Sequence, residues 1–238
     1  MVFKTTGNKS NSVILFFHAM GVTGESSMPV AEKMAEKYYC IMPTSTVYCS
    51  GQRYQSKRDE IQQIVRFLWN HGIKEIELIV ASSIGADLAM AFLTEIKIPV
   101  KHVFFDGGQF AQIGKTLKRI MWCDDDKIKP YFIEAGKNLT YGNLRRQLTD
   151  SLEDKPFPEL SEELQKHTFW EFGSIEEHFK YRNAVMQTYI HGNFPVFEGF
   201  NHMQYQIQNP EGFARMLETI IETDRLPELA FAMWYRGK

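Results

Sequence analysis

The sequence has few cysteines, no long apolar run and no excess of basic residues. Its three cysteines are Cys40, Cys49 and Cys123. The number is odd and the spacing fits no metal site, so we expect free thiols in a reducing compartment. The polar N-terminal segment carries no signal-peptide core, and no apolar run approaches the roughly 20 residues that cross a membrane. These features predict a cytoplasmic protein without a membrane partner.

The charge balance also argues against nucleic acid as a partner. The chain of 238 residues holds 27 Lys and Arg against 29 Asp and Glu, a net charge of −2. Proteins that bind nucleic acid normally carry a basic excess. Hydrophobic residues make up 44% of the chain and charged residues 24%, as in an ordinary globular protein. We expect a small-molecule partner, and the oligomeric state stays open.

Short apolar runs alternate with segments of helical periodicity along most of the chain. The pattern predicts strands at 13–17, 38–42, 76–80, 100–105, 167–172 and 193–200. It predicts helices between them at 29–37, 59–71, 84–93 and 176–189, and a last helix at 210–223. Such alternation is typical of an α/β fold, with a mostly parallel sheet and helices on both faces. Sites in these sheets lie at the carboxyl ends of the strands.

One segment, 109–165, interrupts this rhythm. It has helical patterns at about 110–121, 141–152 and 159–165, without a convincing strand. We therefore predict a core formed by 1–108 and 166–238 with a helical cap inserted at 109–165. The run at 124–126 is three aspartates. No histidine or second carboxylate cluster accompanies it, so we interpret it as a solvated loop rather than a metal site.

The segment from Ala81 to Gly85 has the pattern of a nucleophile elbow. A strand-type run ends there and a helical segment begins at Ile84, so the chain must turn sharply around a serine. Small residues two positions before and two after that serine let the strand and helix pass closely. Gly85 stands two residues after Ser83, which favours Ser83 over Ser82 as the nucleophile.

The order of these features resembles the α/β-hydrolase fold, and the resemblance covers nearly all of the chain. It rests on the elbow and on three turns that follow predicted strands, namely His18-Ala19-Met20-Gly21, Gly173-Ser174-Ile175-Glu176 and Asn201-His202. The order Ser, acid, His is the one this superfamily uses. Ala19 and Ala81 stand where glycine is usual, and Glu176 stands where aspartate is commoner. At most one strand fits before residue 13.

Ser83 needs a base, because an isolated serine hydroxyl is a poor nucleophile at neutral pH. Of the seven histidines, His202 directly follows a predicted strand downstream of the elbow and precedes the last helix; His191 is the weaker candidate. The base in turn needs a carboxylate to orient it. Glu176 is our first choice, and Glu177 is the alternate in the same turn.

Asp106 is a separate alternative for the acid. It ends the predicted strand at 100–105, and some hydrolases of the resembled fold draw their acid from that position.

An oxyanion hole needs two backbone N–H groups directed at the developing charge. One should belong to Ile84, which follows the nucleophile. By the resemblance the other belongs to Met20, with Ala19 as the neighbouring alternative.

Together these residues predict a carboxylesterase-like serine hydrolase that cleaves an ester or thioester of a small molecule without a cofactor or metal. Ser83, His202 and Glu176 would form the catalytic triad, with Met20 and Ile84 as the oxyanion hole. The same triad can support cleavage of a C–C bond or acyl transfer. A non-catalytic ligand-binding protein can also keep the fold. Reaction with a fluorophosphonate distinguishes the catalytic possibilities from the binding protein.

Overall fold

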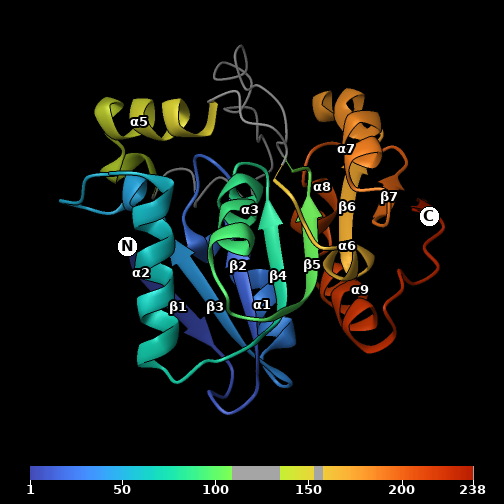
Figure 1. Cartoon of the computed structure of the whole chain (residues 1–238), viewed down its shortest axis with the longest axis horizontal. Coiled ribbons are helices and arrows are strands. Elements are labelled where there is room, and N and C mark those ends of the chain that lie inside the picture. Colours follow the sequence, from blue (N-terminus) through green and yellow to red (C-terminus); the bar gives the residue numbers. More distant parts are fainter. Residues whose placement is uncertain (109–134, 153–157, 238) are drawn as a thin grey trace.

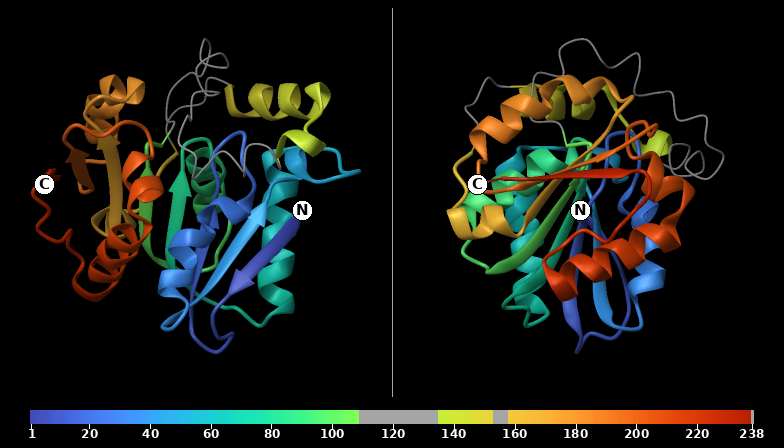
Figure 2. Two further views of the ribbon diagram at one scale, coloured as in Figure 1. Left: turned by 180° about the vertical axis from the view of Figure 1, so that it is seen from behind. Right: turned by 90° about the vertical axis from the view of Figure 1, so that its right-hand side faces the viewer.

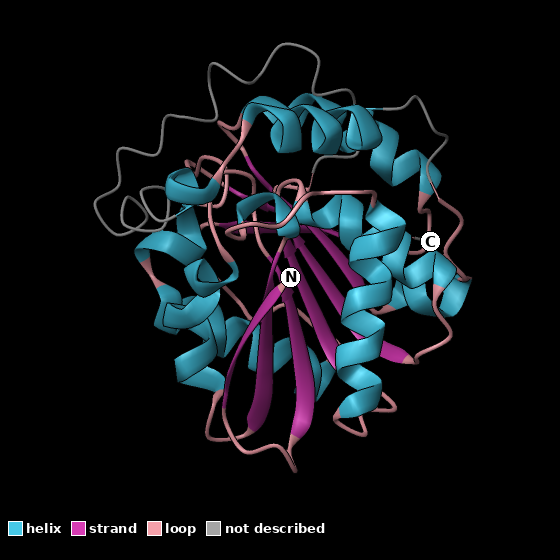
Figure 3. Ribbon diagram, turned by 90° about the vertical axis from the view of Figure 1, so that its left-hand side faces the viewer, coloured by secondary structure: helices cyan, strands magenta, loops and turns pink. Residues whose placement is uncertain are grey.

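The described residues form one sheet of eight strands in the order β1-β3-β2-β4-β5-β6-β7-β8 (Figure 1). The structure is a computed structural model that describes residues 1–108, 135–152 and 158–237. The strands are β1 (Val2–Thr6), β2 (Ser12–Phe17), β3 (Tyr38–Thr44), β4 (Ile76–Ser82), β5 (Val100–Asp106), β6 (Thr168–Gly173), β7 (Asn193–Phe197) and β8 (Ala232–Arg236). The six inner strands of the sheet run parallel to one another. The two edge strands, β1 and β8, pair antiparallel with β3 and β7. The strands twist relative to one another (Figure 3).

Helices cover both faces of the sheet, as the sequence predicts. On one face lie α2 (Lys57–Asn70) and α3 (Gly85–Glu95), and on the other α1 (Met28–Met34) and α9 (Pro210–Thr223), as the right-hand view of Figure 2 shows. The apolar run of β2 serves both cores, because alternate side chains point to opposite faces. Leu15 is buried with the α2–α3 core, and Phe16 is buried with the α1–α9 core.

The chain starts these helices with side-chain caps. The Ser56 hydroxyl accepts a hydrogen bond from the Asp59 N–H at 3.1 Å at the start of α2. The Asn209 carbonyl oxygen accepts one from the Gly212 N–H at 2.9 Å, and Pro210 opens α9. None of the helices in the described ranges is long and apolar enough to cross a membrane.

Three elements differ from the sequence prediction. The predicted helix at 176–189 is a 3-10 turn, η3 (Glu177–Tyr181), followed by α7 (Arg182–Thr188). The predicted strand at 193–200 ends at Phe197, because the chain turns at Gly199, where φ is +78°. The pattern did not predict β8, whose residues are half exposed at the sheet edge. The single early strand β1 agrees with the expectation of at most one.

The described part of 109–165 includes α5 (Tyr141–Leu152), which lies beyond the carboxyl ends of the strands (Figure 1). Polar contacts attach it to the core. The Asn143 amide donates to the Gln52 carbonyl oxygen at 3.0 Å, and the Tyr54 hydroxyl donates to Asp150 at 2.7 Å. The helix predicted at 159–165 is α6 (Glu162–Lys166). The helix predicted at 110–121 and the three aspartates at 124–126 lie outside the described residues.

Candidate active site

Ser83 occupies a tight turn between β4 and α3. Its φ is 54°, a left-handed conformation that non-glycine residues rarely adopt. Its N–H donates to the Asp106 carbonyl oxygen at 3.0 Å, and its own carbonyl oxygen accepts from the Ala86 N–H at 3.0 Å. Backbone strain of this kind persists where the surrounding structure enforces it, and it concentrates at functional sites. The strand, the tight turn and the helix thus follow one another at Ser83 as the sequence predicts.

Gly85 makes the turn possible by letting α3 pass close to β2. A Cβ atom at this position would lie 2.4 Å from the Phe17 carbonyl oxygen and 2.7 Å from that of His18. Both are backbone atoms that cannot easily move away. Ala81, by contrast, is fully buried in the strand and accommodates its methyl group. Glycine is therefore required two residues after Ser83, whereas alanine fits two residues before it.

His202 and Glu176 form a hydrogen-bonded pair. His202 Nδ1 lies 2.7 Å from Glu176 Oε2; the carboxylate side chain is fully buried, and the imidazole is 28% exposed. An ionised carboxylate only accepts hydrogen bonds, so Nδ1 carries the hydrogen and Nε2 keeps the lone pair of a base. Burial lowers the pKa of His202, but the hydrogen bond to Glu176 and the charges of Glu176 and Asp106 outweigh it and raise the pKa.

The loop after β6 directs Glu176 inward. Glu176 precedes the η3 turn in an extended conformation, with φ −76° and ψ 153°, and its N–H donates to the Gly173 carbonyl oxygen at 3.2 Å. A Cβ atom at Gly173 would lie 2.4 Å from the Phe200 carbonyl oxygen. The loops that carry Glu176 and His202 thus pack against each other. Glu177, the alternate acid, lies in η3.

The Asp106–Gly107 segment contacts both the elbow and the imidazole. The Asp106 carbonyl oxygen accepts the Ser83 N–H, and Gly107 has φ +59°. A Cβ atom at Gly107 would lie 2.4 Å from His202 Nδ1 and 3.0 Å from Glu176 Oε2. His202 and Glu176 therefore lie against Gly107, and the preceding residue, Asp106, holds the Ser83 turn through its carbonyl oxygen. Gly107 follows a strand that the sequence predicts, but the sequence does not show that this position requires glycine.

The Asp106 carboxylate faces Glu171 rather than occupying the position of Glu176. The two residues are directly paired in register on β5 and β6, and both are buried. Burial raises the pKa of Asp106 to about 6, although a hydrogen bond from Glu171 opposes this. Burial and the neighbouring charges of Asp106 and Glu176 raise the pKa of Glu171 well above its ordinary range. Glu171 therefore keeps its proton, and Asp106 contributes a negative charge that raises the pKa of His202.

Hydrogen bonds to a neighbouring loop hold the turn that contains Met20. The His18 ring lies with Nδ1 2.7 Å from the Ala19 carbonyl oxygen, and its Nε2 accepts from the Ser45 N–H at 3.0 Å. Burial lowers the pKa of His18 to about 4, so the ring is neutral. The Gly21 N–H donates to the Tyr48 hydroxyl at 2.9 Å. His18 is thus a structural residue of this turn.

An apolar cluster joins α5 to the elbow. Leu148 of α5 packs with Met20 and Ile84, the two residues expected to form the oxyanion hole, and Leu144 packs against the same cluster. This contact places α5, which belongs to the predicted cap, against Met20 and Ile84.

Other polar residues near the site were not foreseen from the sequence. Gln206 of α8 (Gln204–Gln208) donates to the Ser82 hydroxyl at 2.9 Å, so the Ser82 side chain is hydrogen-bonded to α8. Both residues line a cavity of about 30 Å³. The ring centroid of His178 lies 5.2 Å from that of His202. Burial and the charge of His202 lower the pKa of His178 to about 4, so it stays neutral beside the base.

Several solved structures share this architecture. A hydrolase-family protein from Desulfitobacterium hafniense is 14% identical with a TM-score of 0.69, and the match covers 92% of this chain and 100% of that one. An Exiguobacterium antarcticum esterase is 12% identical with a TM-score of 0.70, covering 93% and 95%. A carboxylesterase structure from Nitrososphaera gargenis is 11% identical with a TM-score of 0.69, covering 94% and 96%.

Sequence comparison adds no relative: no protein-family model matches the chain, and no curated protein matches it. The structural likeness and the strand order show that the chain has the α/β-hydrolase fold.

Proposed function

We propose that the protein is a serine hydrolase that cleaves a carboxylic ester or thioester of a small molecule. The observation that carries this is the 2.7 Å contact between His202 and the fully buried Glu176, packed on the same Asp106–Gly107 segment that holds the Ser83 elbow. The esterases and hydrolases among the structural neighbours support the proposal.

In the proposed reaction, Ser83 Oγ attacks the carbonyl carbon of the substrate and passes its proton to His202 Nε2. Glu176 holds the imidazole and stabilises its positive charge. The C–O or C–S bond then breaks, and the leaving alcohol or thiol takes the proton from His202. A water molecule, deprotonated by His202, attacks the acyl-enzyme and releases the acid and free Ser83. Every proton passes through one imidazole, so no cofactor is needed.

The backbone amides of Ile84 and Met20 are the proposed oxyanion-hole donors. Ile84 directly follows the nucleophile at the start of α3, where the helix dipole also favours negative charge. Met20 lies in the turn held by His18 and Tyr48. Because Met20 and Ile84 also form an apolar cluster with Leu148, we expect an uncharged acyl group to be preferred there.

Covalent labelling tests the proposal directly. A fluorophosphonate probe should label the wild-type chain once, at Ser83, and Ser83→Ala should abolish labelling and lower ester turnover by at least about 10³-fold. Ser82→Ala is the matched control and should still be labelled. A folded wild-type protein that resists the probe would instead favour the non-catalytic binding protein.

Substrate panels then distinguish the reaction classes. A series of p-nitrophenyl esters of increasing chain length should be run beside acyl thioesters. Release of free acid from either series supports hydrolysis. Transfer of the acyl group to an added alcohol or amine, with little free acid, would instead identify an acyltransferase on the same triad.

A further inference from the structure

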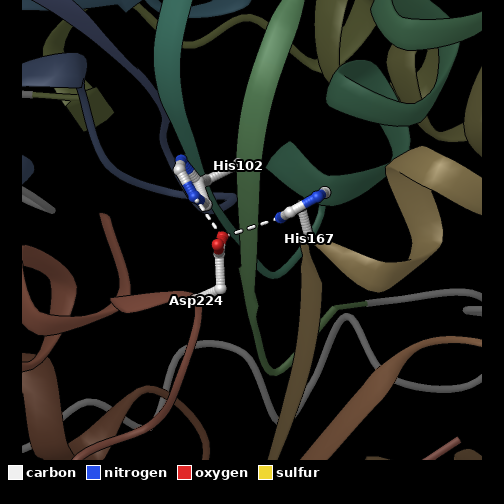
Figure 4. Close-up of side chains that lie close together, drawn as sticks. All are labelled: His102, His167 and Asp224. Atoms are coloured by element: carbon white, nitrogen blue, oxygen red, sulfur yellow. Dashed lines mark hydrogen bonds and ion pairs between the residues drawn. The ribbon is translucent and has the colours of Figure 1, made fainter. Parts of the chain in front are cut away.

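A second cluster of histidine and carboxylate lies at the opposite end of the parallel strands. His102 lies near the start of β5, His167 directly precedes β6, and Asp224 ends α9 (Figure 4). Asp224 Oδ1 is 2.8 Å from His102 Nε2 and 2.7 Å from His167 Nδ1. Two imidazoles therefore converge on a single carboxylate oxygen.

The outer nitrogen of each ring also faces an oxygen acceptor. His102 Nδ1 is 3.2 Å from the Glu77 carbonyl oxygen, and His167 Nε2 is 3.3 Å from Glu163 Oε1. A carbonyl oxygen and an ionised carboxylate have no proton to donate, so each outer nitrogen is placed to donate its hydrogen to that oxygen. In a neutral ring the inner nitrogen then holds a lone pair. Such a lone pair points at Asp224, which is itself an acceptor, whereas an inner nitrogen that carries a hydrogen donates to it.

At 2.7 and 2.8 Å these contacts are hydrogen bonds where the inner nitrogen carries a hydrogen; where it holds a lone pair, a positive charge must lie between nitrogen and oxygen. One divalent cation satisfies all three inner atoms at once. The outer hydrogen bonds then have the arrangement that orients metal-binding histidines in known sites, where each ligand ring donates to a carbonyl or carboxylate.

We propose that His102 Nε2, His167 Nδ1 and the Asp224 carboxylate bind a divalent transition-metal ion, with zinc as the best fit. Imidazole with one carboxylate suits zinc, whereas calcium and magnesium require mostly oxygen ligands. The three ligand atoms lie within 4.8 Å of one another. Ligand atoms around tetrahedral zinc lie about 3.3 Å apart. The Asp224 side chain, which is 50% exposed, and the partly exposed His167 ring would therefore move by roughly 1 Å to reach that spacing around the ion.

The position of the cluster gives the ion a structural role. His102 and Asp106 are both on β5, so their Cα atoms are about 13 Å apart along the strand. The ion would link the end of α9 to the starts of β5 and β6 without reaching the substrate. Three protein ligands leave a fourth position for water. Asp224 has φ 55° at the turn that leads toward β8, so binding would fix the exit of α9.

Zinc titration of the chelator-treated full chain tests the site. We expect one Zn²⁺ per chain by calorimetry, a Tm higher by roughly 5 °C at saturating Zn²⁺, and a tetrahedral-type visible spectrum with Co²⁺. Asp224→Asn is the sharpest variant, because asparagine keeps the shape and tolerates the left-handed conformation. His167→Gln, at a partly exposed position, is the second variant.

Both variants should weaken Zn²⁺ binding at least tenfold and abolish the Co²⁺ spectrum, while circular dichroism stays unchanged. His71→Ala removes an exposed histidine outside the cluster and should bind Zn²⁺ like the wild type. Equal affinity in the wild type and in Asp224→Asn would overturn the proposal. So would loss of the single tight site in His71→Ala.

Discussion

Two clusters at opposite ends of the same sheet use the same two kinds of side chain. At the carboxyl ends of the strands, one imidazole bonds a fully buried carboxylate at 2.7 Å. At the amino ends, two imidazoles contact one oxygen of the half-exposed Asp224 at 2.7 and 2.8 Å. The difference lies in the lone pairs. One buried carboxylate leaves a lone pair available on His202, as a base requires, whereas the other cluster gathers two imidazoles around one carboxylate oxygen, as the proposed cation site requires.

Both clusters also depend on unusual backbone. Three non-glycine residues of the described ranges have positive φ, namely Ser83, Met203 and Asp224. Ser83 is the proposed nucleophile, Met203 directly follows the proposed base, and Asp224 is the proposed metal ligand. Strained conformations persist only where surrounding contacts enforce them. The turn at Ser83 is thus held by the contacts of the elbow, whereas Asp224 has the left-handed conformation that commonly ends a helix.

The largest effect we predict separates the two acids beside His202. Glu176→Gln should lower kcat/KM for a p-nitrophenyl ester by about 10³-fold or more, because the amide no longer stabilises the imidazolium or fixes the tautomer. Asp106→Asn should lower it less than tenfold, because the amide oxygen can still accept the hydrogen bond from Glu171. Steady-state kinetics on folded variants measure both, and the reverse ranking would assign the triad acid to Asp106.

A smaller effect should follow from crowding the pair. Gly107→Ala places a methyl group 2.4 Å from His202 Nδ1, so the imidazole must move. Displacement by about 1 Å costs roughly 10²-fold in kcat/KM. Gly72→Ala is the matched control, since Gly72 has a similar φ of +70° but nothing within 4 Å of the added atom. Both variants carry the cost of a left-handed alanine, roughly 1 kcal/mol of stability, but only Gly107→Ala adds the clash and should lose activity. Equal kcat/KM in the two would contradict the packing argument.

The sequence predicted the fold because its signals are local. The continuous apolar run at 13–17 and the caps at Ser56 and Asn209 act within a few residues, and the structure has those elements. The edge strand β8 was missed because its exposed residues carry no strong apolar pattern. The helix expected from Glu176 begins later, because the chain stays extended at Glu176 and its carboxylate turns inward.

The candidate site was predictable to the extent that topology brings strand ends together. Ser83, His202 and Glu176 each follow a strand, so parallel pairing places them at one edge. Gly107 and Glu171 gain their importance only from three-dimensional packing. The same holds for His102, His167 and Asp224. Asp224 lies 122 residues after His102, and no metal-ligand spacing in the sequence indicates the cluster.

The buried charge beneath His202 predicts a shift in the pH profile. His202 must be neutral to act as a base, so kcat/KM should fall as the pH drops through its pKa. Glu176 and Asp106 raise that pKa. Asp106→Asn removes one of these charges, so the midpoint of the acid limb should move to lower pH while the turnover stays measurable. A pH–rate series at constant ionic strength measures it. An unchanged or raised midpoint would show that Asp106 is not ionised beside the base.

The smallest effect we predict is that zinc leaves catalysis unchanged, which is the sharpest test of the separation between the two ends. One equivalent of Zn²⁺ should raise the Tm of the wild-type chain but alter kcat/KM by less than about twofold, since tight binding requires the carboxylate and both lone pairs of the amino-end cluster. His178 and His202 are the competing pair, with ring centroids 5.2 Å apart. If Zn²⁺ bound this pair instead, it would block His202, and ester turnover would be lost at one equivalent of Zn²⁺. That outcome would place the tight zinc site at the carboxyl ends of the strands. Retained turnover with a raised Tm would mean that the two clusters divide the chemistry of histidine and carboxylate between them, one for proton transfer and one for metal binding.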